Sequence, residues 1–231
     1  VPFREDAEHG AQRGARYLGA ITTVCHLVAD QTREALAAGR TPLVLGGDHS
    51  LAAGSIAGAS AHLAASGKRL GVIWIDAHGD VNTPGTSRSG NVHGMPLAHL
   101  LGHGDHALAG IAGAKPAIRA ADVALVGVRD LDGPEREHIA EWKITTYTMR
   151  ELDERGVHDV LEEAIAVVSK ETDGIRASVD MDVVDPESAP GVGTAVSGGM
   201  TYREAHHAME MLADTGRLVG LDLVEVNPVL D

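Results

Sequence analysis

One repeated unit constrains the fold of this chain more than any other feature: a short apolar run, then a polar loop, then a segment with helical periodicity. A clear case is the apolar run 41–45, which ends at Gly46-Gly-Asp-His-Ser50 and leads into a helical pattern over 51–65. Strands that alternate in this way with helices are typical of parallel α/β proteins. Aromatic residues make up only 3% of the chain, which favours close packing of helices on strands. We therefore expect an α/β fold with a mostly parallel central sheet.

The remaining elements follow from the same periodicities. Strands are expected at 69–75, 121–128, 143–147 (an edge strand), 175–179 and 217–224, and helices at 14–38, 96–101, 134–142, 157–169 and from Thr201 to just before Gly216. Thr201 and Glu204 have the spacing of a capping box at the start of the last helix. No Pro- or Ser-rich linker divides the 231 residues, so we expect a single domain.

Charge and cysteine content narrow the possible functions. The chain has 19 basic and 33 acidic residues, a net charge of −14, which argues against nucleic acid as a partner and agrees with a cationic substrate or bound metal ions. Cys25 is the only cysteine, so no internal disulfide framework is expected. No stretch has the length of a membrane span, and the first residues lack the profile of a signal peptide. We expect a cytoplasmic protein with no membrane partner.

The stretch Asp76-Ala-His-Gly-Asp80 is the first candidate site. It sets three metal-capable side chains at alternate positions directly behind the apolar run 71–75, so an extended chain would point all three the same way. Carboxylates and imidazole without a thiolate suit a hard or borderline divalent ion such as Mn²⁺. The alternative interpretation is a solvated loop with one chance histidine.

Polar residues follow five of the predicted strands at what should be one edge of the sheet, the edge where open α/β sheets place their ligands. These residues are His49, the stretch 76–80, the loop 129–135, the pair Asp180 and Asp182, and Glu225. Among them are four aspartates and two histidines, enough to hold two divalent cations if carboxylates bridge the ions. A water held between two such ions loses a proton near neutral pH and becomes a nucleophile.

The connections between the elements supply further polar groups. The long loop 81–95 carries Asn82, Ser89 and Asn91 as hydrogen-bonding groups and His93 as an acid or base. Asp132 and Glu135 form a carboxylate pair at a helix start, where acidic residues also serve a purely structural role. Three further histidines, whose spacing matches no ligand pattern, are expected on the surface: His99, His103 and His106.

Three motifs resemble the signatures of the ureohydrolase family: Gly-Gly-Asp-His-Ser50, Asp-Ala-His-Gly-Asp80 and Ser-Val-Asp-Met-Asp182. Narrower marks resemble the arginases within that family, and they span most of the chain. They are Asn82-Thr-Pro, Ser89-Gly-Asn-Val-His-Gly94, Arg-Asp-Leu-Asp132 with Glu135, Thr194 followed by Gly-Gly-Met-Thr-Tyr-Arg-Glu204, and Glu-Val-Asn-Pro228. The resemblance implies a three-layer α/β/α architecture with a mostly parallel sheet, as in arginases.

The resemblance also implies a cofactor and a reaction. Two Mn²⁺ ions per chain would be bound, one by His49, Asp76, Asp80 and Asp180 and the other by Asp76, His78, Asp180 and Asp182. A metal-bridging hydroxide would attack the guanidinium carbon of L-arginine and release L-ornithine and urea. By the same resemblance, Asp80 would relay a proton to the leaving amine, His93 would exchange protons with solvent, and Glu225 would orient the guanidinium.

For the rest of the substrate, the resemblance implies a set of polar contacts. Asn82, Ser89 and Asn91 would hold the α-carboxylate, Asp132 and Glu135 the α-amino group, and Thr194 would close over the guanidinium end. A homo-oligomer, trimer or hexamer, is implied as well. Family members usually begin with a further strand and helix and continue with a helix after Pro228, so the domain 1–231 is expected to lack these pieces.

Two alternatives stay open from the sequence. One is a ureohydrolase that acts on agmatine or on a guanidino acid, whose substrates lack part of the amino-acid head. The other is an inactive fragment that binds arginine without hydrolysing it.

Overall fold

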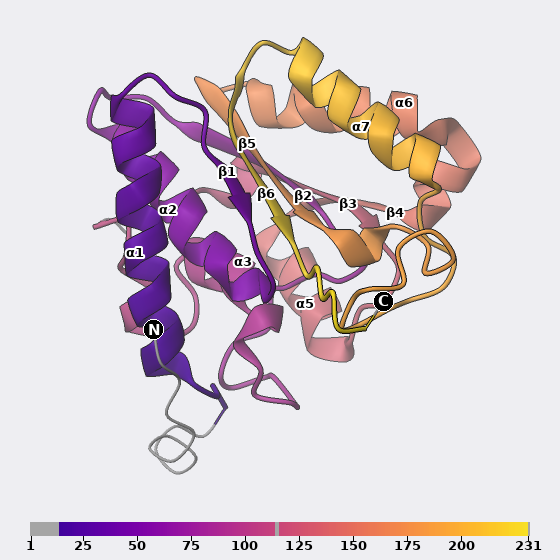
Figure 1. The fold of residues 1–231 in the computed structure, drawn as a ribbon, viewed down its shortest axis with the longest axis horizontal. Helices are drawn as coiled ribbons and strands as arrows, with labels where there is room; N and C mark the ends of the chain where they lie inside the picture. Colours follow the sequence, from indigo (N-terminus) through magenta and orange to yellow (C-terminus); the bar gives the residue numbers. More distant parts are fainter. Residues whose placement is uncertain (1–13, 114–115, 231) are drawn as a thin grey trace.

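The centre of the fold is a six-stranded parallel sheet in the order β1-β6-β5-β2-β3-β4 (Figure 1). The computed structural model describes residues 14–113 and 116–230. The strands are β1 (Leu43–Leu45), β2 (Leu70–Ile75), β3 (Val123–Val128), β4 (Thr145–Thr148), β5 (Gly174–Asp180) and β6 (Leu218–Val224). Every pairing in the sheet is parallel, and β4 lies at one end of it, so the predictions of a parallel sheet and of an edge strand there are both confirmed.

The strand order places a topological switch point between β2 and β5. From β2 the chain moves outward to β3 and β4, and it then returns to the other side of β2 to add β5. The register pairs Trp74 with Ser178 and Ile75 with Val179, so the carboxyl ends of the two strands lie side by side. Open α/β sheets bind their ligands outside the carboxyl ends of the strands at such a point.

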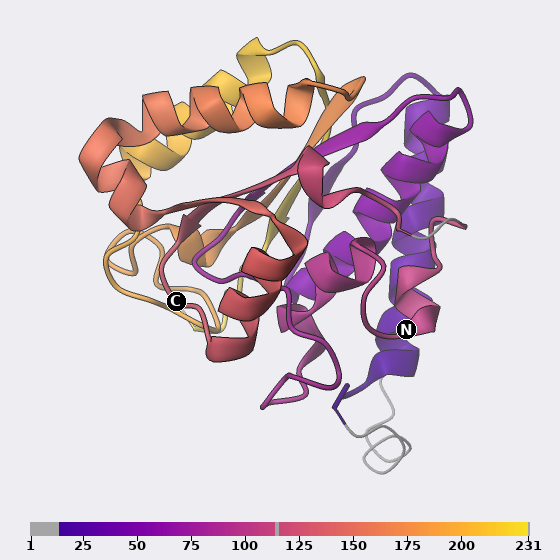
Figure 2. The same ribbon diagram turned by 180° about the vertical axis from the view of Figure 1, so that it is seen from behind.

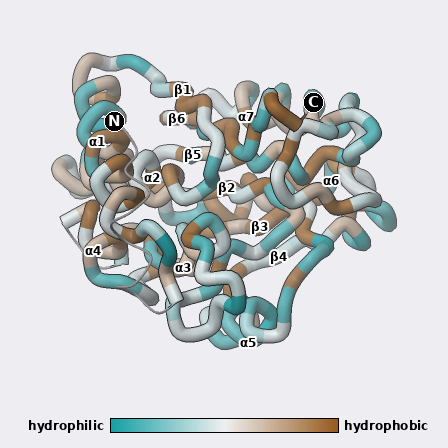
Figure 3. The backbone as a smooth tube through the Cα atoms, turned by 60° about the horizontal axis from the view of Figure 1, so that its bottom comes forward, coloured by the Kyte–Doolittle hydropathy of each residue, from teal (hydrophilic) through white to brown (hydrophobic). Residues whose placement is uncertain are grey.

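Helices cover both faces of the sheet, which gives the three-layer α/β/α arrangement (Figures 1 and 2). The helices are α1 (Leu18–Ala37), α2 (Ala52–Ala64), α3 (Pro96–Leu100), α4 (His106–Ala109), α5 (Gly133–Trp142), α6 (Met149–Ser169) and α7 (Tyr202–Asp214). Alternate residues of β2 enter different cores: Val72 and Trp74 pack with α2 and α3, whereas Ile73 packs with α6 and α7. Figure 3 shows brown, apolar residues along the strands in the middle of the view, and brown and teal residues in turn along the helices around them. No helix within the described ranges is both long and apolar enough to cross a membrane.

Helix α1 packs on the outside of α2 at close range. A Cβ atom added at Gly54 would lie 2.3 Å from the carbonyl oxygen of Cys25, and one added at Gly58 would lie 2.4 Å from that of Ala29. Only glycine allows the two helix backbones to approach this closely. The contact buries Cys25 and also supports the short helical turn η1 (His49–Leu51), because the Cys25 thiol donates to the Ser50 carbonyl at 3.2 Å.

Several boundaries differ from the sequence-based predictions. Helix α1 begins at Leu18 rather than at residue 14, and α6 begins at Met149 rather than at 157. Gly156, with φ +82°, interrupts α6. The part after Gly156 corresponds to the predicted helix. The part before it was not predicted, and it begins with a Thr148–Glu151 capping box. The prediction that His99 lies on the surface is wrong: His99 is fully buried in α3 and its Nδ1 pairs with the Met95 carbonyl at 2.7 Å. His103 and His106 are exposed, as expected.

Candidate metal centre

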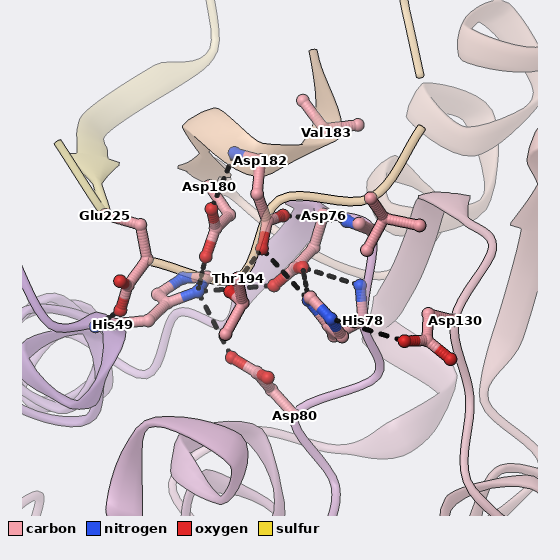
Figure 4. A network of polar contacts seen from close by, with 12 residues as sticks. His49, Asp76, His78, Asp80, Asp130, Asp180, Asp182, Val183, Thr194 and Glu225 are labelled. Carbon is pink, nitrogen blue, oxygen red and sulfur yellow. Dashed lines mark hydrogen bonds and ion pairs between the residues drawn. The ribbon is translucent and has the colours of Figure 1, made fainter. Parts of the chain in front are cut away.

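The loops that follow β2 and β5 are built in the same way and meet at the switch point (Figure 4). Asp76 Oδ1 accepts the His78 backbone N–H at 2.7 Å, and Asp180 Oδ1 accepts the Asp182 backbone N–H at 2.8 Å. Each aspartate thus closes a tight turn on the residue two positions later. The turn at Asp76 brings the His78 imidazole back toward that aspartate, and the turn at Asp180 fixes the backbone that carries Asp182.

This geometry corrects the expectation of an extended chain over 76–80. The strand ends at Ile75, and Asp80 has φ +54°, a left-handed backbone conformation. The side chains of the stretch still converge, but they do so through a turn rather than through strand alternation. Glu225, directly after β6, is left-handed as well, at φ +59°. Non-glycine residues in this conformation cost on the order of 1–3 kcal/mol and cluster at functional sites.

His49 collects three of the four aspartates around one nitrogen. Its Nδ1 lies 3.2 Å from Asp76 Oδ2 and 3.1 Å from both Asp80 Oδ2 and Asp180 Oδ2. Its other nitrogen, Nε2, pairs with Ser178 Oγ at 2.9 Å. With Nε2–H donating to Ser178, the lone pair of Nδ1 faces the carboxylates, where a metal ion would take it.

A second group forms around His78 and shares Asp76 with the first. His78 Nδ1 lies 3.0 Å from Asp182 Oδ2 and 3.5 Å from Asp76 Oδ1. These contacts define two overlapping groups that can each hold an ion: His49, Asp76 and Asp180, and Asp76, His78 and Asp182. The structure brings together all six of the predicted metal ligands, and Asp76 stands between the two groups as a bridge.

The electrostatics of this cluster fit divalent cations. Burial and the charge of Asp76 raise the pKa of Asp80 to about 7, and the same two causes raise the pKa of Asp180 well above its ordinary range. Burial alone would lower the pKa of His49, but its close contacts with the surrounding aspartates outweigh this and raise the pKa well above the usual value.

A single imidazole cannot neutralise the charge of three carboxylates. Asp80 Oδ2 is buried and makes no hydrogen bond with any described residue, although it lies 3.1 Å from His49 Nδ1. Four carboxylates and two imidazoles, without a thiolate, form a donor set suited to two ions of the Mn²⁺ class, which would supply the missing positive charge.

Two residues of this centre were not predicted from the sequence, Trp74 and Ser178. The Trp74 indole N–H donates to Asp76 Oδ2 at 2.9 Å, and its ring stacks on the His49 imidazole at 4.3 Å between centroids. Each of the two residues precedes a ligand by two positions on its strand, so each shares a sheet face with that ligand. That spacing is the one signal in the sequence that points to them.

A pocket of about 130 Å³ lies against the metal centre. Besides centre residues, it is lined by Asn82, His93, Gly94, Glu135 and Thr194. His93 Nδ1 lies 3.6 Å from Glu225 Oε1, and the hydrogen bond to Glu225 is the main cause that raises the pKa of His93 to about 9. Burial and the charge of Asp80 raise the pKa of Glu135 to about 7. The Thr194 hydroxyl donates to Asp182 Oδ2 at 2.9 Å.

Of the predicted substrate contacts, Ser89, Asn91 and Asp132 lie outside the lining of this pocket. Asp132 and Glu135 form the capping box of α5, so their structural role is confirmed, and Asp132 Oδ2 accepts the Asn82 amide at 3.0 Å. Ser89 is exposed, and its hydroxyl accepts the Asn91 backbone N–H at 3.1 Å. Asp132 thus lies next to the pocket through its contact with Asn82, and we call Asp132 and the polar residues of the 82–91 loop the polar rim.

Arg129, at the exit of β3, holds the loop that carries Asp182 and Thr194. Its Nη2 donates to the carbonyl oxygens of Asp182 and Val196 at 2.6 Å, and its Nη1 donates to that of Val183 at 3.2 Å. Three carbonyls from two separate stretches of the loop thus converge on one guanidinium, which fixes their distance from each other.

Known proteins match the chain over most of its length. The sequence profile of the arginase family matches residues 8–231. An arginase from Brevibacillus brevis is 50% identical over 216 residues, which are 94% of this chain and 71% of that protein. The native structure of arginase from Bacillus caldovelox superimposes with a TM-score of 0.94 at 48% identity, covering 100% of this chain and 76% of that one. Entamoeba histolytica arginase in complex with L-ornithine gives a TM-score of 0.91 at 32% identity, covering 100% of this chain and 77% of that one. The chain belongs to the arginase family.

Proposed function

We propose that this protein is a manganese-dependent hydrolase that converts L-arginine and water into L-ornithine and urea. The observation that carries the proposal is the pair of overlapping groups around His49 and His78, which share Asp76 at the switch point of the sheet. A site for two adjacent divalent ions beside a small pocket suits hydrolysis of a polar, unactivated C–N bond. Membership of the arginase family supports the choice of reaction.

The residues that would hold the two ions follow from the distances above. His49, Asp76, Asp80 and Asp180 would bind one ion, and Asp76, His78, Asp180 and Asp182 the other. When bound, the two ions supply a hydroxide nucleophile at neutral pH. The chain itself supplies a rigid cage, because the tight turns at Asp76 and Asp180 fix the ligands before any ion arrives.

Proton transfer is assigned to groups that face the pocket. Water adds its oxygen to the guanidinium carbon, and the bond from that carbon to the substrate's chain nitrogen breaks. Asp80 Oδ2, which makes no hydrogen bond within the described part of the chain, takes the proton of the nucleophile and passes it to the leaving amine. His93 lies at the pocket wall with 26% of its side chain exposed, so it can exchange protons between the leaving amine and solvent.

Substrate orientation is assigned to the pocket and its rim. Glu225 would accept hydrogen bonds from the guanidinium, and its orientation is fixed by the His49 backbone N–H, which donates to Oε1 at 2.7 Å. Thr194, bound to Asp182, would close over the guanidinium end. Asn82, Ser89 and Asn91 would hold the α-carboxylate, and Asp132 and Glu135 the α-amino group, all from the polar rim or the adjoining wall.

The polar rim also distinguishes hydrolysis of L-arginine from the nearest alternative function, hydrolysis of agmatine. Agmatine has no α-carboxylate, so it would lose the hydrogen bonds from the 82–91 loop, and a hydrogen bond to a charged group contributes about 1.5–3 kcal/mol. We therefore expect L-arginine to be hydrolysed faster than agmatine by Mn²⁺-loaded protein. Faster hydrolysis of agmatine would favour the rival ureohydrolase.

A second rival is a protein that binds arginine but does not hydrolyse it. The test is release of urea from L-arginine with saturating Mn²⁺, together with metal analysis of the same sample. His78→Asn should remove both Mn²⁺ uptake and urea release, whereas the control His26→Asn, at an exposed position on α1, should change neither. Full activity in His78→Asn would contradict the two-metal site, and arginine binding without urea would favour the binding protein. Cytoplasmic location and a homo-oligomer stay predictions from the sequence.

A further inference from the structure

A third group of metal-binding side chains lies beside the two that form the metal centre. It consists of Asp48, His93 and Glu225, whose ligand atoms all lie within 4.8 Å of one another. The three residues come from different segments: the loop after β1, the short helical turn η2 (Val92–Gly94) and the exit of β6. The fold thus joins three distant parts of the sequence into one imidazole–dicarboxylate group that the proposed two-metal site does not use.

The group is open to solvent and its carboxylates are held in place. Asp48 is exposed, and 26% of the His93 side chain and 12% of the Glu225 side chain are accessible. Asp48 Oδ1 accepts the Ser50 backbone N–H at 3.0 Å, which leaves its second oxygen for an ion. Glu225 is oriented in the same way by the His49 backbone N–H. An ion can therefore enter from solvent and meet side chains whose orientations are already set.

The donor set and the spacing suit Zn²⁺. Zinc binds imidazole and carboxylate ligands at about 2.0–2.2 Å in tetrahedral geometry, so two ligand atoms on one ion lie about 3.4 Å apart. His93 Nδ1 and Glu225 Oε1 are separated by 3.6 Å, close to that value. Three protein ligands would leave the fourth position for water, as in open zinc sites.

We propose that Asp48, His93 and Glu225 form a third, inhibitory site for Zn²⁺ at the mouth of the metal centre. An ion bound there occupies the Glu225 carboxylate and a nitrogen of His93. In the proposed function, on which this inference rests, these are the groups that hold the guanidinium and exchange its proton. Zinc in this site therefore competes with L-arginine, and high concentrations of arginine relieve the inhibition.

Inhibition by zinc at the third site must be distinguished from inhibition by replacement of manganese in the metal centre. Zn²⁺ binds nitrogen and oxygen sites more tightly than Mn²⁺ does, so it could displace manganese from the two-metal centre. Displacement lowers the manganese content of the protein, and arginine does not reverse it. A third site instead retains both manganese ions and adds a zinc ion.

Asp48→Asn is the decisive variant, because Asp48 has no part in the proposed reaction and Asn can still accept the Ser50 N–H. Asp153→Asn is the matched control: it removes the same charge from an exposed aspartate on α6, outside this group and outside the metal centre. The half-inhibitory concentration of zinc is measured on Mn²⁺-loaded protein at low and high arginine. Equilibrium dialysis against Zn²⁺, with analysis of both metals, gives binding independently of activity.

We expect the wild-type protein and Asp153→Asn to bind one zinc ion while retaining manganese, and to be inhibited competitively. In Asp48→Asn, zinc binding and inhibition should weaken by about tenfold or more, since loss of a partner even outside the ligand shell weakens metal binding by about 10–100-fold. Equal inhibition of Asp48→Asn and wild type, or release of manganese in step with inhibition, would overturn the proposal. Absence of urea release from any sample would instead refute the proposed function, and the dialysis would still decide whether Asp48 helps to bind zinc.

Discussion

Trp74 gives the sharpest test of how the metal centre is held. Its indole N–H is the donor to Asp76 Oδ2, and Asp76 is the carboxylate common to both metal groups. Trp74→Phe keeps an aromatic ring in the core but removes this donor from a fully buried carboxylate. A hydrogen bond to a charged group contributes about 1.5–3 kcal/mol, which corresponds to roughly 10–150-fold in an equilibrium constant. Loss of a partner outside the ligand shell typically weakens metal affinity by about 10–100-fold, so both routes predict a similar effect.

The assay is the Mn²⁺ concentration that half-saturates urea release, supported by direct Mn²⁺ binding in equilibrium dialysis. Trp142→Phe is the control, because Trp142 stacks on His103 and His138, away from the centre. Ser178→Ala removes the partner of His49 Nε2 with little change in volume and should act in the same direction as Trp74→Phe. A folded Trp74→Phe protein whose Mn²⁺ affinity stays within about threefold of wild type would refute the reasoning, since the expected loss begins at about tenfold.

Three further predictions concern stability and reactivity. Arg176→Met should lower the free energy of unfolding by about 3–5 kcal/mol in urea denaturation, because it leaves the fully buried Asp222 without its partner at 2.5 Å; a loss below about 1 kcal/mol would show that the pair contributes little. Cys25 should resist alkylation by iodoacetamide at pH 8 in the native protein, because burial raises the pKa of its thiol to about 12, and it should react once the protein is unfolded; rapid labelling of the native protein would contradict the burial of Cys25. Removing the metal should lower the melting temperature more at pH 8 than at pH 6. Burial and the charge of Asp76 raise the pKa of Asp80 to about 7, so the folded metal-free protein binds more protons than the unfolded chain between about pH 4 and 7 and loses that stability as the pH rises through 7. Equal effects of chelation at both pH values would argue against this crowding of carboxylates.

The sequence predicted elements well where local chemistry decides the structure. The Thr201–Glu204 capping box starts α7 as expected, and the strand cores of β2 and β5 agree closely with the apolar runs. Predictions failed where contacts between distant parts of the chain determine whether a residue is buried. His99 lies in the predicted helix 96–101 and was expected on the surface, yet the structure buries it completely beneath the loop around Gly104.

The metal ligands could be predicted because they are Asp and His residues in short motifs directly after strands. The carboxyl ends of parallel strands lie at one edge of the sheet, so these motifs were expected to meet there. The partners of those ligands could not be predicted in the same way. Trp74 and Ser178 look like ordinary strand residues in the sequence, and only the register of β2 against β5 places them beneath the centre. Arg129 likewise finds its three carbonyl partners more than 50 positions further along the chain.

The position of β6 in the sheet has a consequence for the order in which the molecule assembles. β6 is the last strand of the described chain, yet it lies between β1 and β5 and pairs with both. During synthesis, β1 therefore has no strand β6 to pair with until more than 170 further residues have been made, and the position of His49 after β1 is not yet fixed. Sheets that depend on such distant pairings form slowly, because the chain entropy is lost before the contacts are gained. The position of His49 beside Asp180 is thus set only after β6 has joined the sheet, so the ion-binding cage is completed long after its first ligand has been synthesised.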